Sequence, residues 1–497
     1  PINRLKTKHY GVMKKHRTYI QILISLLLGI QVLFAQEKPT TITFLSVNDM
    51  HATLDRFPRF AYMVDSLRGL YPDLVLVSAG DNQTGNPIND QFSPKGYPMV
   101  ALMNAVGFNY STVGNHEFDS RPYGFALLTQ EAQFPFICSN VEVEPYIGIR
   151  ILPSTVHTFY DKGVRVALLG AVQLEADGKP ATHPDWLHGI KFELARDVLP
   201  RYKDMHDRCD ATVLISHLGL EEDQVVATQN PWIDLIIGGH SHTYLPAPVE
   251  VGSVSISQSG CKLQHLNMMQ MTLHKGKVIA KEAHSLPIDP KAGKENKEVR
   301  ALVDQFNNNP VFSEVVGTAL DNFTSYDQLG YFMVDAYRSM TESDIAVQNN
   351  GGVRISKLPK GDITRRDILT LDPFGNEMMV ADLSLDELKA LLLSGTVREE
   401  EHRPFLISGA TAHYVFTPDK KCTSIELRDA KGKPLSPKRR YKVAYNSYIN
   451  AAYPYEHKQP AVGQGYNTAE AIMRYIGQLK KVPSYQKASP RIHIKVK

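Results

Sequence analysis

Cysteine is scarce in this chain and its few copies are scattered. Small disulfide-stabilised domains need many cysteines, and thiolate zinc sites need closely spaced ones, so neither class fits. No C-x-x-C pair occurs, and the spacing leaves open whether the thiols are buried and free or paired. The four residues are Cys138, Cys209, Cys261 and Cys422.

The chain also lacks a strong charge of either sign. The formal net charge is +3 over 497 residues, and no basic patch is interleaved with aromatic residues, so we predict no nucleic-acid polymer as partner. Hydrophobic residues make up 43% and charged residues 22%, with no low-complexity tract, as in a folded protein. The length predicts two large domains, or three.

Beyond the N-terminal region, no apolar run reaches the length of a membrane span. At the N-terminus a basic cluster at 14–17 precedes an apolar run at 20–34, which ends at Ala35. This order is typical of a secretory signal peptide, and roughly 15 apolar positions fall short of the about 20 that a span needs. We therefore predict a signal region at 1–35, cleaved after Ala35, and a protein exported to the periplasm, the cell surface or the medium. An uncleaved anchor is the alternative.

After residue 40, short apolar runs alternate with helical patterns. Alternation of this kind predicts an α/β core with largely buried strands. We expect strands at 41–47, 74–78, 164–172, 212–216 and 235–237, and helices at 60–70 and 98–106.

The pattern changes near residue 300. A polar loop at 290–296 precedes a linking helix expected at about 297–307, so we place a first domain at 36–300, a linker at 301–320 and a second domain at 321–497. The second half has an α+β pattern. It contains expected helices at 329–340 and 384–393, a turn at 350–352, and strands at 412–416 and 441–445.

Five segments of the first half hold side chains that bind divalent metals, each after an expected strand or in a glycine-flanked turn. They are 48–51, 80–82, 114–119, 216–217 and 239–242. Each alone is a weak signal, because a Gly-Asp pair is commonly a turn and a single His is commonly structural. Together they offer oxygen and imidazole donors without thiolate, a set that suits Zn, Mn, Fe or related ions.

Two pairs of these donors are spaced two residues apart. Asp49 with His51, and His240 with His242, would each point to one side of an extended chain. With the Asp, Asn and His between them, the donors suffice for two metals bridged by one carboxylate. Two metals about 3.5–4 Å apart activate a water molecule and clamp phosphate oxygens. The sequence therefore predicts a two-metal phosphoesterase centre.

The strings VNDMHATLD, SAGDNQTGNP, VGNHEFD, ISHLG and IIGGHSH resemble the motifs of calcineurin-like metallophosphoesterases. More narrowly, they resemble the 5'-nucleotidase family, which includes UDP-sugar hydrolases and ecto-5'-nucleotidases. NNGGVR and LDPFGNEM extend the resemblance into the second half. It implies an N-terminal sandwich of two sheets flanked by helices, followed by a C-terminal α+β substrate-binding domain.

The resemblance also implies which residues hold two divalent ions of the Zn, Mn, Fe or Co class. The first ion is assigned to Asp49, His51, Asp81 and His242, and the second to Asp81, Asn115, His217 and His240, with Asp81 as the bridge.

His116 and Asp119 match the catalytic pair of the family. If Asn115 is a ligand, His116 is free to face the substrate, where an imidazolium stabilises charge on phosphate or protonates the leaving group. Asp119 would orient this ring and raise its pKa.

Four residues of the second half match substrate-binding positions: Asn349, Arg354, Phe405 and Tyr448. In the family a base lies between two aromatic rings, which suits its flat apolar faces. A hairpin turn at 350–352, or core positions for the two aromatics, are the alternatives. The chain departs from the family in lacking an Arg within 321–330 and the Asp expected after Tyr448.

We thus predict an exported hydrolase that releases phosphate from a nucleoside 5'-phosphate by attack of a metal-activated water. The partner is a small phosphate ester, and no membrane span remains after signal removal. One alternative is a nucleotide-sugar or 2',3'-cyclic-nucleotide phosphodiesterase with the same centre. The other is a non-catalytic surface binding protein.

Overall fold

The computed structural model describes residues 38–398 and 404–497. The basic and apolar segment that we interpret as a signal peptide lies outside the described residues. Within them, no helix combines the length and apolarity needed to cross a bilayer.

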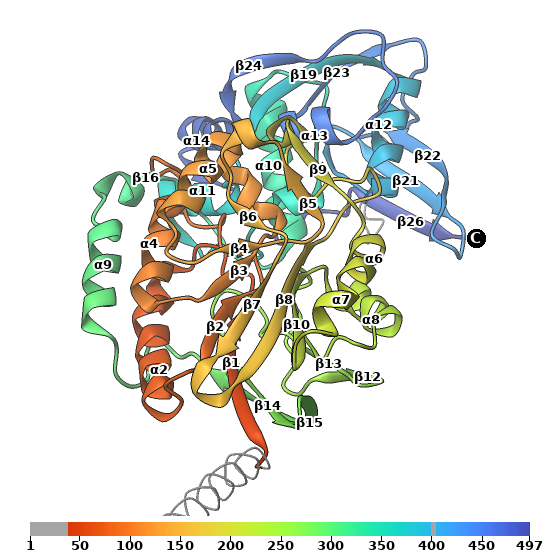
Figure 1. Ribbon diagram of the computed structural model, residues 1–497. Coiled ribbons are helices and arrows are strands. Elements are labelled where there is room, and N and C mark those ends of the chain that lie inside the picture. Colours follow the sequence, from red (N-terminus) through yellow and green to blue (C-terminus); the bar gives the residue numbers. More distant parts are fainter. Residues whose placement is uncertain (1–37, 399–403) are drawn as a thin grey trace, which may run out of the picture.

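The core of the first half is formed by two large sheets that pack face to face (Figure 1). One has the order β15 (Lys277–Pro287), β14 (His265–His274), β1 (Thr40–Val47), β2 (Val75–Ser78), β3 (Tyr110–Thr112), β4 (Phe136–Ile137) and β6 (Ile151–Leu152). The other has the order β12 (Val249–Val251), β13 (Val254–Ser257), β11 (Leu235–Ile237), β10 (Ala211–His217), β8 (Val164–Val172) and β7 (Ser154–Phe159).

Helices cover the outer faces of both sheets, so the central strands are buried on both sides. In β1, Ile42 and Phe44 pack between the sheets, whereas Leu45 and Val47 pack among the helices. This explains the continuous apolar runs, since a strand covered on both faces needs apolar residues at successive positions. The covering helices are α2 (Phe57–Leu70), α4 (Tyr97–Val106) and α5 (Arg121–Glu131) on one side, and α6 (Ala195–Val198), α7 (Lys203–His206) and α8 (Leu220–Gln229) on the other.

The strand order brings the five metal-binding segments together. β1, β2 and β3 run parallel in one sheet, and β8, β10 and β11 run parallel in the other. The carboxyl ends of parallel strands meet at one edge, where sites are built in such folds. Four of the five segments follow β1, β2, β3 and β11, and the fifth ends β10 at His217. The sandwich predicted from the sequence is confirmed.

Helix α9 (Lys297–Asn307) links the halves, at the residues where the linking helix was predicted. The linker predicted at 301–320 is too long, because residues 315–319 already form a strand of the second half. The Asn296 side chain caps it by accepting hydrogen bonds from two backbone N–H groups of its first turn. α9 packs against α2 and α4 of the first half.

The second half has the predicted α+β character. Its main sheet has the order β20 (Leu406–Ser408), β17 (Ile345–Gln348), β23 (Arg440–Asn446), β19 (Glu377–Ser384) and β24 (Val462–Asn467). Two three-stranded sheets join it, β18 (Gly361–Thr364)–β16 (Val315–Ala319)–β25 (Lys481–Val482) and β22 (Cys422–Arg428)–β21 (Thr411–Phe416)–β26 (Ile492–Val496). Its helices are α10 (Tyr326–Met340), α11 (Arg365–Leu371), α12 (Leu385–Arg398), α13 (Ser447–Ala452) and α14 (Thr468–Leu479).

The Asn-Gly-Gly segment is not a hairpin turn. Asn350–Gly352 form a short 3-10 turn after β17, whose sheet neighbours are β20 and β23. The four cysteines, all within the described residues, are unpaired.

Candidate active site

The metal-binding loops are bent rather than extended. Asp49 and His51 have φ values of 49° and 45°, in the left-handed region that non-glycine residues seldom adopt. The expectation that two extended pairs present these donors is therefore wrong, and the loop bends themselves bring the donors together. Five of the seven predicted ligands have positive φ: Asp49, His51, Asp81, His240 and His242. Such strain persists where surrounding structure over-determines the backbone, commonly at functional sites.

The close contact between the loops after β2 and β3 depends on a glycine. Gly80, just before Asp81, has a φ of +83°, and a Cβ there would lie 2.7 Å from the backbone nitrogen of Gly114. Without a side chain, the loops after β2 and β3 touch, which places Asp81 beside Asn115 and His116.

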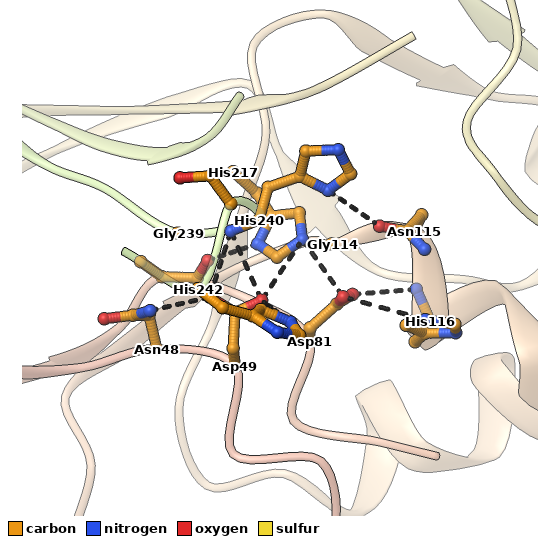
Figure 2. A network of polar contacts seen from close by, with 12 residues as sticks. Asn48, Asp49, Asp81, Gly114, Asn115, His116, His217, Gly239, His240 and His242 are labelled. Carbon is orange, nitrogen blue, oxygen red and sulfur yellow. Dashed lines mark hydrogen bonds and ion pairs between the residues drawn. The ribbon is translucent and has the colours of Figure 1, made fainter. Parts of the chain in front are cut away.

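The first cluster of donors consists of Asp49, His51 and His242. The Nε2 atoms of His51 and His242 lie 2.9 Å apart, and Oδ1 of Asp49 lies 3.4 Å from Nε2 of His242. Figure 2 shows Asp49 and His242 of this cluster beside Asp81. Asp49 is further fixed by the Asn48 amide, which donates to Oδ2 at 2.6 Å.

The second cluster consists of Asp81, His217 and His240. Nε2 of His217 lies 3.2 Å from Oδ2 of Asp81, and Oδ1 of Asn115 lies 3.2 Å from Nδ1 of His240 (Figure 2). The other end of the Asn115 amide donates to the Ala181 carbonyl at 3.1 Å, which directs Oδ1 toward the cluster.

The donor set fits divalent metal ions. His217 is fully buried, and its Nδ1 lies 2.7 Å from the Ala79 carbonyl, to which it donates. Its Nε2 makes no hydrogen bond among the described residues, although Oδ2 of Asp81 lies 3.2 Å away. A buried ring nitrogen without a hydrogen bond is costly, and a metal ion in the centre of these donors would satisfy it. The clusters offer carboxylate, amide and imidazole atoms and no thiolate, a set that suits divalent ions.

In the second cluster, burial and the Asp81 carboxylate shift the pKa values of the two imidazoles in opposite directions. Burial opposes ionisation of His217, but the Asp81 carboxylate raises the pKa of this imidazole to about 10. Burial, reinforced by His217, lowers the pKa of His240 to about 4. Burial also opposes ionisation of Asp81, yet the charges of His217 and His116 hold the pKa of this carboxyl well below its usual range.

His116 and Asp119 form a close pair beside the metal-binding clusters. Nδ1 of His116 donates to Oδ2 of Asp119 at 2.7 Å. Although burial acts in the opposite direction, the charges of Asp81 and Asp119 raise the pKa of His116. Two hydroxyl groups also donate to the Asp119 carboxylate, that of Thr84 at 2.7 Å and that of Thr182 at 2.8 Å.

Glu117, the residue after His116, was not among the site residues predicted from the sequence. This buried carboxylate accepts hydrogen bonds from the backbone N–H groups of Asp81, Asn82 and Gly114, at 3.0, 2.8 and 2.7 Å. It thereby fastens the loops after β2 and β3 to each other. The only signal in the sequence was the place of this residue in the GNHEFD string. That string does not show whether the carboxylate is buried between loops or exposed on the surface.

A cavity of about 640 Å³ connects the metal-binding centre with the second half. Of the four residues predicted to bind the substrate, Asn349, Arg354 and Tyr448 line it, whereas Phe405 does not. Phe405 is fully buried, because its ring packs against Tyr453 at a centroid distance of 4.9 Å.

The structure instead brings Phe374, from the LDPFGNEM string, to the cavity. Its ring stacks on the His116 imidazole at a centroid distance of 6.0 Å, and the Arg354 guanidinium lies 5.6 Å from its centroid. Phe374 and Tyr448 are thus aromatic residues of the second half that line the same cavity as His116 and Asp119.

Comparisons with known proteins agree with this architecture. Residues 42–244 match the family model described as calcineurin-like phosphoesterase, and residues 311–452 match that described as 5'-nucleotidase, C-terminal domain. The "trifunctional nucleotide phosphoesterase protein YfkN" of Bacillus subtilis is 26% identical over 92% of this chain, which spans only 35% of that relative's length.

Two further similarities cover whole proteins. "Protein UshA" of Salmonella pullorum is 25% identical over 90% of this chain and 92% of its own length. The crystal structure of a 5'-nucleotidase precursor from Thermus thermophilus has a TM-score of 0.81, with 24% identity over 92% of this chain and 99% of that one. The similarity to the Thermus thermophilus structure is a similarity of fold.

Proposed function

The chain belongs to the calcineurin-like phosphoesterases that carry a 5'-nucleotidase C-terminal domain, and from this membership we propose that it hydrolyses a nucleoside 5'-phosphate to nucleoside and phosphate. One observation carries the proposal: a single cavity has metal-ligand candidates and a His–Asp pair on one wall, and Asn349, Arg354, Phe374 and Tyr448 on the other. A phosphate and a flat organic group can therefore be held at the same time.

Two divalent ions would be held by the donors of the first half. Asp49, His51 and His242 would hold one, His217, His240 and Asn115 the other, and Asp81 would bridge them. When bound, such ions supply Lewis-acid activation of water and neutralise phosphate charge.

His116 would act on the ester itself. Because its Nδ1 donates to Asp119, the ring holds its exchangeable proton at Nε2. An imidazolium at this place can donate that proton to a phosphate oxygen or to the leaving oxygen. Asp119 orients the ring and, through its negative charge, favours the protonated form.

The second half would bind the leaving group. Phe374 and Tyr448 offer aromatic faces for a planar base. Arg354 supplies positive charge near the catalytic pair, where a phosphate anion would lie, and the buried Asn349 adds a polar amide. Phe405 has no part in this arrangement, because the core covers it.

A substrate panel tests the proposal. The purified chain, supplied with Mn²⁺ or Zn²⁺, is assayed for phosphate release from AMP, UMP and glycerol 2-phosphate, and for cleavage of UDP-glucose and 2',3'-cyclic AMP. His116→Asn serves as the matched inactive control. We expect the nucleoside monophosphates to have the highest kcat/KM. Preference for UDP-glucose or the cyclic nucleotide would favour a phosphodiesterase, and no cleavage of any ester would favour a binding protein.

We also propose that the protein is exported. The support is the basic, apolar and small-residue order of positions 14–35. Expression of the full chain in a Gram-negative host should place activity in the osmotic-shock fraction, and a chain starting at residue 38 should remain in the cytoplasm. Equal distribution of the two forms would contradict export.

A further inference from the structure

Thr84 holds an unusual position between the metal-binding centre and the catalytic pair. It lies in the loop after β2, three residues beyond Asp81, and it is fully buried. Its φ is 63°, in the left-handed region where a β-branched residue is a marked outlier. Backbone strain of this kind persists only where the surroundings enforce it.

The backbone carbonyl of Thr84 contacts a metal-ligand candidate. Nδ1 of His51 lies 3.1 Å from this oxygen and donates its proton to it. The tautomer with the proton on Nδ1 leaves the lone pair of Nε2 directed at Asp49 and His242. Such outer contacts set the orientation and tautomer of metal-binding imidazoles.

The side chain of the same residue contacts the catalytic pair. Oγ1 of Thr84 donates to Oδ2 of Asp119 at 2.7 Å, the oxygen that also accepts the proton of His116. Oδ1 of Asp119 accepts from Thr182, so each carboxylate oxygen has its own hydroxyl donor. The two threonines therefore fix the carboxylate plane, which in turn sets the His116 ring.

We propose that Thr84 is a positioning residue that orients two functional groups through two different atoms. Its carbonyl aims His51 at the metal, and its hydroxyl aims Asp119 at His116. Its left-handed backbone conformation allows both contacts to form at once. This inference rests on the proposed function only for its effect on turnover.

Three substitutions separate the two roles. Thr84→Ser keeps the hydroxyl, Thr84→Ala removes it while keeping the carbonyl in a conformation that alanine tolerates better than a β-branched residue, and Thr84→Gly also frees the backbone. Thr182→Ala is the matched control, because it removes a hydroxyl from the same carboxylate and no contact of Thr182 with His51 is seen in the described residues.

We expect Thr84→Ala and Thr182→Ala each to lower kcat about tenfold, the loss for one hydrogen bond to a charged group, with KM within about twofold. Thr84→Ser should retain kcat within about twofold. Turnover of AMP by the metal-loaded proteins measures both constants. Wild-type kcat in Thr84→Ala, or equal loss in Thr84→Ser and Thr84→Ala, would overturn the role of the hydroxyl.

The rate of metal release tests the role of the Thr84 carbonyl in an experiment that needs no substrate. The loaded proteins are mixed with excess chelator, and the half-time of metal release is followed with a colorimetric indicator. Thr84→Gly should release metal at least about tenfold faster than wild type, whereas Thr84→Ala and Thr182→Ala should match wild type. Unchanged release from Thr84→Gly would overturn the role of the carbonyl. Inactivity of the wild type towards every ester would count against the proposed function instead, because the release experiment does not depend on it.

Discussion

The Nε2 atoms of His51 and His242 lie 2.9 Å apart, although Nδ1 of His51 already donates to a backbone carbonyl. With its proton on Nδ1, His51 presents only a lone pair to His242. Oδ1 of Asp49, an acceptor, lies 3.4 Å from the same His242 atom. Acceptors gathered this closely repel each other unless a proton or a metal ion lies among them.

Removal of metal should abolish activity and lower thermal stability. Treatment with EDTA leaves the buried acceptors uncompensated, whereas a metal at 100 times its Kd stabilises the fold by about 2.7 kcal/mol. Phosphate release and the midpoint of thermal unfolding check this before and after chelation, with Mn²⁺ or Zn²⁺ added back. EDTA presaturated with Zn²⁺, which can take up neither Mn²⁺ nor further Zn²⁺, is the control for nonspecific effects. Full activity in EDTA would contradict a metal-dependent centre.

Asp81→Asn should reduce metal content more than Asp49→Asn. Asp81 belongs to two groups of converging donors, one with His51 and one with His217, whereas Asp49 belongs to one. We therefore expect fewer than one ion per chain in Asp81→Asn, about one in Asp49→Asn, and kcat losses above about a hundredfold in both. Elemental analysis of the purified proteins decides this. Two ions retained in Asp81→Asn would contradict its role as the bridge.

His116→Asn should lose turnover but keep its metal. His116 donates to Asp119, and its Nε2 lies 4.0 Å from Oδ2 of Asp81, too far for a direct hydrogen bond. Loss of a general acid lowers kcat by about 10²- to 10⁴-fold. Steady-state kinetics and metal content of the same preparation provide the check. A parallel fall in kcat and in metal content would indicate that His116 acts as a metal ligand.

The location of the site could be predicted from the sequence, but its conformation could not. Polar residues that follow buried strands must meet at one edge of the sheets, whatever the loop geometry. The positive φ of Asp49 and His51 depends on backbone contacts with the distant loop at Gly80 and Asp81, which spacing does not reveal.

The prediction that Phe405 contributes a ring to the substrate site failed for a related reason. Phe405 was selected from its local string, whereas its burial arises from packing against Gly395 of α12 and against Tyr453. Such contacts are non-local, so a string alone cannot show whether a ring faces the core or a cavity. Phe374 reaches the cavity because its loop lies over His116.

Substitution of the two phenylalanines should therefore have opposite consequences. Phe374→Ala removes an aromatic face, so we expect KM for AMP to rise about tenfold, and KM for glycerol 2-phosphate to change less than twofold. Phe405→Leu should lower the free energy of unfolding by about 1 kcal/mol and leave KM for AMP unchanged. Steady-state kinetics and denaturant unfolding distinguish them. A raised KM in Phe405→Leu alone would restore the assignment made from the sequence.

Asp372 should make the fold less stable at neutral pH than at acidic pH. Burial raises the pKa of this carboxyl to about 6, from an ordinary value of 3.8. Because the folded state holds the proton more tightly, stability contributed by the neutral carboxyl is complete below pH 3.8 and is lost as pH rises toward 6. The difference between the two pKa values corresponds to about 3 kcal/mol of folding free energy.

Asp372→Asn removes this titration while keeping the shape of the side chain and an acceptor for the Tyr337 hydroxyl, which lies 3.5 Å from Oδ2. The difference in unfolding free energy between variant and wild type should therefore shift in favour of the variant by about 2 kcal/mol between pH 4 and pH 8, most of the full effect. Urea unfolding of the two proteins at both values measures it. Asp382→Asn, at a half-exposed position in β19 beside Arg440, is the control. An equal difference at both pH values would show that Asp372 is ionised in the folded protein throughout this range, because its neighbours, and not its burial, set its pKa.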